Sequence, residues 1–198
     1  MQPRRRSRTQ HRYARDCAAG RADVRARSGN AGADVRDYTV YSNSGFSGQV
    51  YHVSPGTKKL PKFNKLKAKG AIYTTSLNVP ERSFLEGFPG VTDRVEWFAI
   101  DYAAKFWVDA AAQYRFSLTA DDAGKLYIDG HEVIDNDGIR PPRIRTGRRN
   151  LSRGVHSIRV EYMQGPGDRV ALVLEIAGPG EDFHVFSTND FWPPPTGE

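Results

Sequence analysis

Strict alternation of apolar and polar side chains is the feature of this sequence that most constrains its fold. It occurs in "QYRFSLTA" (113–120), "HSIRVEY" (156–162) and "VALVLEI" (170–176). In a β-strand successive side chains point to opposite faces, so a period of two is typical of a strand with one buried face. These segments therefore predict an all-β fold.

A tight hairpin is predicted within the segment "KLYIDGHEVI". The Asp-Gly pair at 129–130 suits a two-residue type I′ turn, in which both central residues need a positive φ. The register that follows pairs Leu126 with Val133 and Ile128 with His131.

Further strands are predicted early and in the middle of the chain. The segment "GFSGQVYHV" (45–53) is one, and "RVEWFAIDY" (94–102), rich in β-formers, is another that would place Trp97 in the core within its strand. The segment "AAKFWVDAAA" (103–112) favours a helix by propensity alone, but it leads directly into the next strand. We expect it to be a strand or an irregular edge. A short helical turn is predicted near "ERSFLEG" (81–87).

Six lysines lie in "SPGTKKLPKFNKLKAKG" (54–70), together with Leu60, Phe63 and Leu66. Lysine runs are usually solvated. We expect a surface loop that is anchored by the three apolar residues, and an anion-binding patch is the alternative.

The net charge of +6 is concentrated at the N-terminus. Residues 1–36 contain ten Arg and three Asp, a formal +7, which leaves −1 for residues 37–198. This segment has no Leu, Ile, Phe or Trp, so we predict a disordered basic arm. An arginine-rich arm can neutralise phosphates, but no aromatic interleaving or folded basic face supports nucleic-acid binding here.

The sequence also bears on targeting and redox chemistry. No apolar h-region follows the N-terminal charges, so no signal peptide is seen, and no stretch approaches the ~20 apolar residues of a membrane span. The only cysteine is Cys17, in the arm, so residues 37–198 contain neither disulfides nor thiolate metal ligands. Those residues are numerous enough for one domain with a sizeable core.

Six carboxylates crowd the stretch from Ser117 to Gly138. Asp and Gly are ordinary turn residues, because Asp side chains bond nearby backbone N–H groups. An EF-hand loop is excluded around "IDNDG", because Val133 stands where the first acid would be needed. Most of these acids are therefore interpreted as turn residues.

The segment "YRFSLTADDAGKLYIDGHEVIDNDG" resembles the central signature of the PA14 domain family. The segments "GFSGQVYHV" and "LSRGVHSIRVEYMQGPGDRVALVLEI" are similar to its opening strand and its closing strand pair. The resemblance covers roughly residues 38–192. It implies an antiparallel β-sandwich or barrel over 37–198, and the family occurs in toxins, as a non-catalytic insert of glycosidases, and as a lectin in yeast adhesins. One departure is Ala123, which stands between the Asp pair and Gly124.

The resemblance also implies a site. In the adhesins an adjacent Asp pair binds calcium, which holds sugar hydroxyl groups, and Asp121 and Asp122 occupy that pair here. Asp168 is a candidate third ligand. Neighbouring side chains on a strand diverge, so the two acids can share one ion only where the backbone bends, as at a cis peptide. The alternative is that the pair is an ordinary turn.

Catalysis finds little support in this sequence. It has no H-E-x-x-H, G-x-S-x-G or phosphate-loop motif, and adjacent acids in a turn do not provide the two separated carboxylates of a glycosidase. Trp192, near the C-terminal prolines, is a candidate exposed aromatic that could stack on sugars.

Two function classes remain open at this point. The first is a non-catalytic module that binds a glycan or glycoconjugate, with Ca²⁺ as its candidate cofactor. The second is a structural or protein-interaction module of a larger surface or secreted protein. The family suggests an extracellular or cell-surface location for either class.

Overall fold

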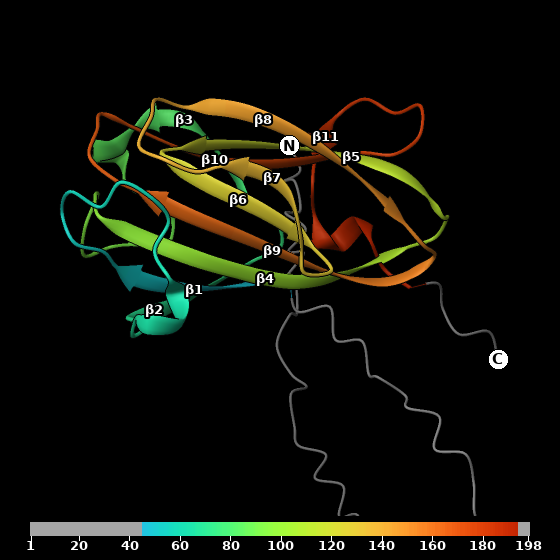
Figure 1. The fold of residues 1–198 in the computed structure, drawn as a ribbon, viewed down its shortest axis with the longest axis horizontal. Helices are drawn as coiled ribbons and strands as arrows, with labels where there is room; N and C mark the ends of the chain where they lie inside the picture. The colour runs from blue at the N-terminus through green and yellow to red at the C-terminus, as the bar shows by residue number, and fades with distance from the viewer. Residues whose placement is uncertain (1–44, 194–198) are drawn as a thin grey trace, which may run out of the picture. The chain divides into compact units, whose positions relative to one another are not determined.

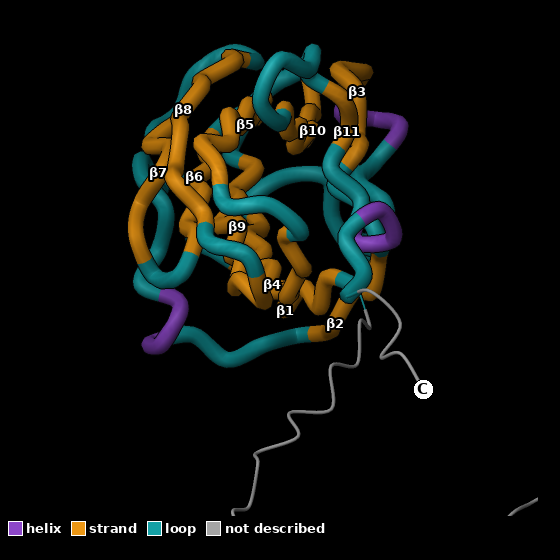
Figure 2. Tube along the Cα trace, turned by 90° about the vertical axis from the view of Figure 1, so that its right-hand side faces the viewer, coloured by secondary structure: helices purple, strands orange, loops and turns teal. Residues whose placement is uncertain are grey.

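A computed structural model describes residues 45–193, and the predicted arm (1–36) and the first residues of the predicted domain lie outside them. The described chain forms an antiparallel β-sandwich, as predicted (Figure 1). Figure 2 shows its two sheets along their strands, one across the top and the other along the left and lower sides. None of the helices within 45–193 is long and apolar enough to cross a membrane.

The larger sheet has six strands in the order β2-β1-β4-β9-β6-β7. Their bounds are β1 Phe46–His52, β2 Gly70–Thr74, β4 Phe98–Val108, β6 Ala123–Ile128, β7 His131–Asn136 and β9 Gly154–Gln164. The smaller sheet has the order β11-β10-β5-β8, and β3 pairs with β10. Its bounds are β3 Asn78–Ser83, β5 Ala112–Asp121, β8 Arg143–Leu151, β10 Arg169–Ala177 and β11 His184–Val185.

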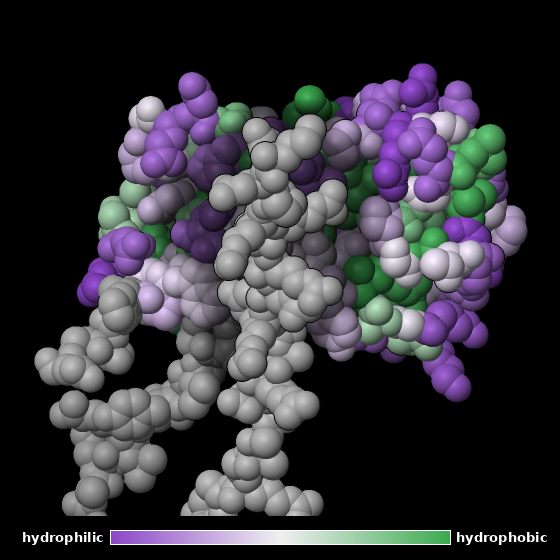
Figure 3. Space-filling model, turned by 180° about the vertical axis from the view of Figure 1, so that it is seen from behind, coloured by the Kyte–Doolittle hydropathy of each residue, from purple (hydrophilic) through white to green (hydrophobic). Residues whose placement is uncertain are grey.

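The core lies between the sheets and is formed by the apolar positions of the alternating segments. Phe116 and Leu118 of β5, Leu174 of β10 and Val160 of β9 are fully buried. The large exposed apolar side chains come from separate elements, among them Leu85 and Ile144. Figure 3 shows hydrophilic side chains interspersed with smaller hydrophobic areas on one face. The period-two prediction is therefore confirmed.

The β6–β7 hairpin confirms the predicted turn and corrects the predicted register. Asp129 and Gly130 have φ angles of 51° and 73°, and Ile128 pairs with His131. Leu126 is buried as expected, but it pairs with Ile134 rather than Val133. A β-bulge adds one residue to β7 between these pairs, so the prediction for Val133 was wrong.

Two predictions for the middle of the chain also need correction. The strand predicted at 94–102 begins only at Phe98, because Trp97 before it has a φ of 58° and is half-buried outside the strand. The segment from 103 is a strand as far as Val108, as expected. It is not an edge, since β4 pairs with β1 and, along its whole length, with β9.

Three short 3₁₀ helices complete the fold: η1 Phe63–Lys65, η2 Phe84–Glu86 and η3 Thr188–Asp190. The second confirms the predicted helical turn, and Ser83 and Glu86 form a capping box at its start. The lysine-rich loop is anchored at Phe63, whose ring packs edge-on against Tyr51. All six of its lysines are exposed, as expected.

Candidate functional site

The Asp pair lies where the chain passes from one sheet to the other. β5 ends at Asp121, β6 begins at Ala123, and the peptide bond between Asp121 and Asp122 is cis. The two residues are 5% and 4% exposed, and both line a cleft of about 450 Å³. The structure thus brings both carboxylates to one cleft.

Asp122 is held by backbone donors from two loops. Its Oδ1 accepts a hydrogen bond from the Arg140 backbone N–H at 3.1 Å, and its Oδ2 accepts one from the Gly165 N–H at 2.7 Å. Burial raises the pKa of this carboxyl, and the two N–H groups oppose that rise. A Cβ at Gly165 would lie 3.0 Å from Oδ2 and 2.6 Å from Ile139 Cδ1, so glycine lets this backbone N–H approach Asp122 without displacing either side chain.

Asp121 has a different environment, although it is the adjacent residue. Burial, followed by the charges of Asp122, Glu81 and Asp168, raises the pKa of Asp121 to about 7. Among the described residues, no group donates a hydrogen bond to its side-chain carboxylate. Its backbone oxygen accepts a hydrogen bond from the Tyr162 hydroxyl at 2.7 Å. The charge of Arg169 opposes the rise in pKa only in part, so burial and the neighbouring acids still favour a bound cation at this carboxylate.

Asp168 lines the same cleft as the Asp pair. Glu81 of β3 also lines it and forms an ion pair with Arg169 at 3.7 Å. Sequence reasoning missed Glu81, because it lies 40 residues before the pair and no local pattern marks it.

The acids of the cleft bear on whether it can hold a metal ion. Within residues 45–193, no three His, Cys, Asp or Glu side chains are close enough together to hold a metal ion. Calcium takes six to eight oxygen ligands, including backbone carbonyls and solute oxygens. The donor set fits an open oxygen site: Asp121 and Asp122 would hold the ion, and the remaining ligands would come from backbone or solute oxygens.

The structure does not bring Trp192 together with the Asp pair. Trp192 is 50% exposed, as expected. It follows Phe191, whose carbonyl accepts a hydrogen bond from the backbone N–H of Trp107, a β4 residue that pairs with Val155 near the start of β9. The backbone N–H of Asp122 donates a hydrogen bond to the Met163 carbonyl oxygen, near the end of β9. At ~3.3 Å per residue, these two points of β9 are roughly 25 Å apart.

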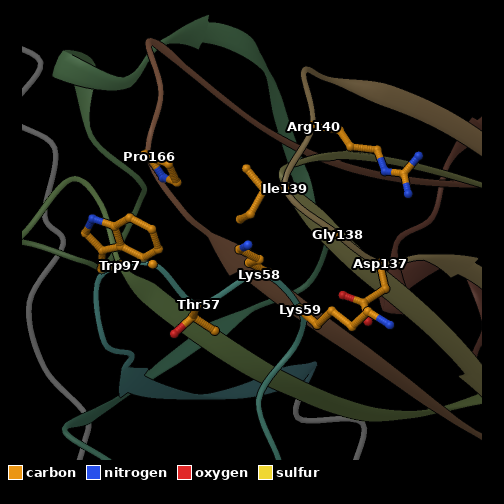
Figure 4. Close-up of a pocket in the computed structure, with 10 residues that line it drawn as sticks. Thr57, Lys58, Lys59, Trp97, Asp137, Gly138, Ile139, Arg140 and Pro166 are labelled. Atoms are coloured by element: carbon orange, nitrogen blue, oxygen red, sulfur yellow. The ribbon is translucent and has the colours of Figure 1, made fainter.

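A second hollow, of about 630 Å³, adjoins the cleft (Figure 4). Ile139, Arg140 and Pro166 line both cavities. The second hollow is also lined by Trp97 and by the loop that contains Lys58 and Lys59. The structure therefore places an aromatic residue and part of the lysine-rich loop beside the Asp pair.

Comparisons with known proteins agree with this architecture. The family model of the PA14 domain matches residues 38–182. Among curated proteins, no sequence matches the chain.

Several solved structures share the fold at low sequence identity. The PA14 domain of the MpAFP antifreeze protein is 20% identical, with a TM-score of 0.62, over 74% of this chain and 88% of that one. A PA14 sugar-binding domain from an RTX adhesin is 19% identical, with a TM-score of 0.61, over 75% of this chain and 97% of that one. The epithelial adhesin 9 A domain from Candida glabrata, in complex with Galβ1-3GlcNAc, is 11% identical, with a TM-score of 0.53, over 74% and 87%.

An anti-sigma factor domain-containing protein is 16% identical, with a TM-score of 0.58, over 78% of this chain. The match spans only 50% of that protein's own length.

Proposed function

Since this chain belongs to the PA14 domain family, we propose that it is a non-catalytic carbohydrate-binding module whose Asp121 and Asp122 hold a calcium ion. The ion would supply positive charge and open coordination positions for sugar hydroxyl oxygens. The protein's own contribution is to hold the two carboxylates at one cleft and to exclude competing donors from Asp121.

One observation carries this proposal: a buried acid pair in which one carboxylate is bonded and the other is not. Both oxygens of Asp122 are oriented by backbone N–H groups, whereas the Asp121 carboxylate receives no donor from the described residues. An ordinary Asp turn would satisfy its carboxylates with nearby backbone N–H groups. Here the pKa of Asp121 is raised to about 7, and a bound divalent cation would reverse that shift.

The solved relatives support the carbohydrate class. One is described as a sugar-binding domain of an adhesin, and another was solved with a disaccharide. Both are adhesins, which supports an extracellular or surface role here. The half-length match to the anti-sigma factor domain-containing protein supports a place for this domain within a larger protein.

That same match, to an anti-sigma factor domain-containing protein, favours the second candidate, a structural or protein-interaction module. The two candidates differ in what they require of the Asp pair. A sugar-binding module needs the cleft carboxylates, whereas a spacer needs only a stable sandwich.

A glycan array probed with calcium and then with chelator tests the proposal. We expect selective glycan binding in calcium, loss of binding in chelator, and loss in both Asp121→Asn and Asp122→Asn. Asp182→Asn is the matched control, because Asp182 is exposed and lies outside the cleft. If the wild-type protein binds no glycan in millimolar calcium, the interaction-module candidate replaces this one.

A further inference from the structure

We propose that the hollow beside the Asp cleft is a subsite for an anionic sugar, one that carries a carboxylate or a sulfate ester. This inference rests on the proposed function, because it assigns the second sugar position of the same glycan. Its volume of about 630 Å³ lies within the range of ligand pockets, roughly 300–1,000 Å³.

The charge of the hollow is the first reason for this assignment. Lys58, Lys59 and Arg140 line it, and no carboxylate among residues 45–193 forms an ion pair with any of them. In Figure 4 the Lys58 amino group lies below Ile139 and to the right of Trp97 in the view. The single acid of the lining, Asp137, accepts a hydrogen bond from the Leu60 backbone N–H at 2.8 Å.

That hydrogen bond also has a positional role. Leu60 follows directly after Lys59, and Asp137 precedes the loop that reaches Arg140. The bond thus links the lysine-rich loop to the β7–β8 loop. Lys58 and Lys59 are exposed like the other lysines of the loop, but they line the hollow, whereas the lysines farther along the loop do not.

Trp97 provides the second reason. It is half-buried, packs against a small core cluster that includes Val53 and Met163, and lines the hollow. Its carbonyl accepts hydrogen bonds from the Val53 N–H at 2.9 Å and from Arg94 Nη1 at 3.1 Å, so its left-handed backbone is held from two sides. An aromatic ring fixed in a cavity wall offers an apolar face to a pyranose ring.

Continuity with the Asp cleft is the third reason. Ile139, Arg140 and Pro166 line both cavities, and the Arg140 backbone N–H is the group that bonds Asp122 Oδ1. A sugar at the Asp pair therefore has its next residue directed over Ile139 and Pro166, toward Trp97 and Lys58. The two cavities together suit a glycan of at least two sugar residues.

The test uses the full chain and a glycan array in which each glycan is present in a neutral, a sulfated and a carboxylated form. We expect the anionic forms to bind about tenfold more tightly than the neutral form in calcium. This preference should weaken at high salt, because partly exposed charges are screened. The sulfated and carboxylated arms show which anion the hollow accepts.

The double variant Lys58→Gln/Lys59→Gln should lose the preference and keep the affinity for the neutral form. Lys65→Gln/Lys67→Gln removes the same charge from exposed lysines outside the hollow and should keep the preference. Equal binding of all three forms by the wild type, or a preference that survives in the first variant, would overturn the inference and leave the proposed function standing.

Failure of the proposed function has a different signature. An anionic preference that persists in chelator, without binding of neutral forms, would contradict the calcium site and still support the basic hollow. No binding of any glycan in calcium would overturn both.

Discussion

The substitution Asp121→Asn should have opposite effects on stability without and with calcium. Asparagine keeps the shape of the side chain and removes its charge. In chelator at pH 8 the variant should be more stable than the wild type, because it removes a buried negative charge beside Asp122, Glu81 and Asp168.

The magnitude follows from the raised pKa of Asp121. The interval from 3.8 to about 7 corresponds to about 4 kcal/mol at about 1.36 kcal/mol per pKa unit. Solvent at the cleft mouth screens part of this, so we expect about 2 kcal/mol. The folded carboxyl keeps its proton up to about pH 7, whereas the unfolded one loses it above 3.8. Wild-type stability therefore falls as pH rises through this window, and the advantage of the variant should shrink as pH falls toward 3.8.

Calcium should reverse the order of the two proteins. At a hundredfold excess over Kd the ion should stabilise the wild type by about 2.7 kcal/mol and the variant by little. The assay is urea unfolding at pH 8 and at pH 4.5, in chelator and in calcium. A variant that is less stable than the wild type in chelator at pH 8 would refute the assignment of an unpartnered buried charge to Asp121.

Three further predictions concern the scaffold. Leu126→Ala should cost roughly 2–5 kcal/mol by urea unfolding, because Leu126 is fully buried, and Tyr127→Ala should cost less; the reverse order would mean that the face assignment is wrong. Asp129→Asn should lower the melting temperature, because Asp129 accepts hydrogen bonds from β9, yet it should leave the calcium-dependent melting shift intact. Loss of that shift would mean that Asp129 belongs to the calcium site. Gly147→Ala should destabilise by roughly 1–3 kcal/mol in the same unfolding assay, since a Cβ there would lie 2.3 Å from the Val133 carbonyl oxygen, and an unchanged midpoint would contradict this packing.

Local patterns predicted the sandwich well, because strand periodicity and turn chemistry are properties of neighbouring residues. The alternation around Phe116 and the Asp129-Gly130 turn are examples, and both agree with the structure. The bulge at Val133 has no signal of this kind. It depends on how β7 packs near β8, where Gly147 approaches the Val133 carbonyl, and these residues are separated in sequence.

The candidate site was predictable only in part. The resemblance indicated Asp121 and Asp122, but their environments come from distant segments: Gly165 after β9, the loop at Arg140, and Glu81 on β3. The sequence could not show that backbone N–H groups would satisfy one acid and leave the other without a donor.

Trp97 shows the same limit. Its flanking residues favour a strand, yet Arg94 and Val53 hold its backbone in the left-handed region beside a cavity. One of these partners, Val53, is distant in the sequence, so local propensity gave the wrong assignment.

The central claim is that the Asp121–Asp122 cleft binds glycan through calcium. It is tested most directly by anomalous diffraction from a crystal grown with calcium and a glycan selected on the array. The account predicts an anomalous peak within about 2.3–2.6 Å of oxygens from both Asp121 and Asp122, with sugar hydroxyls on the same ion. A glycan bound elsewhere, or an Asp cleft without an ion at millimolar calcium, would contradict it.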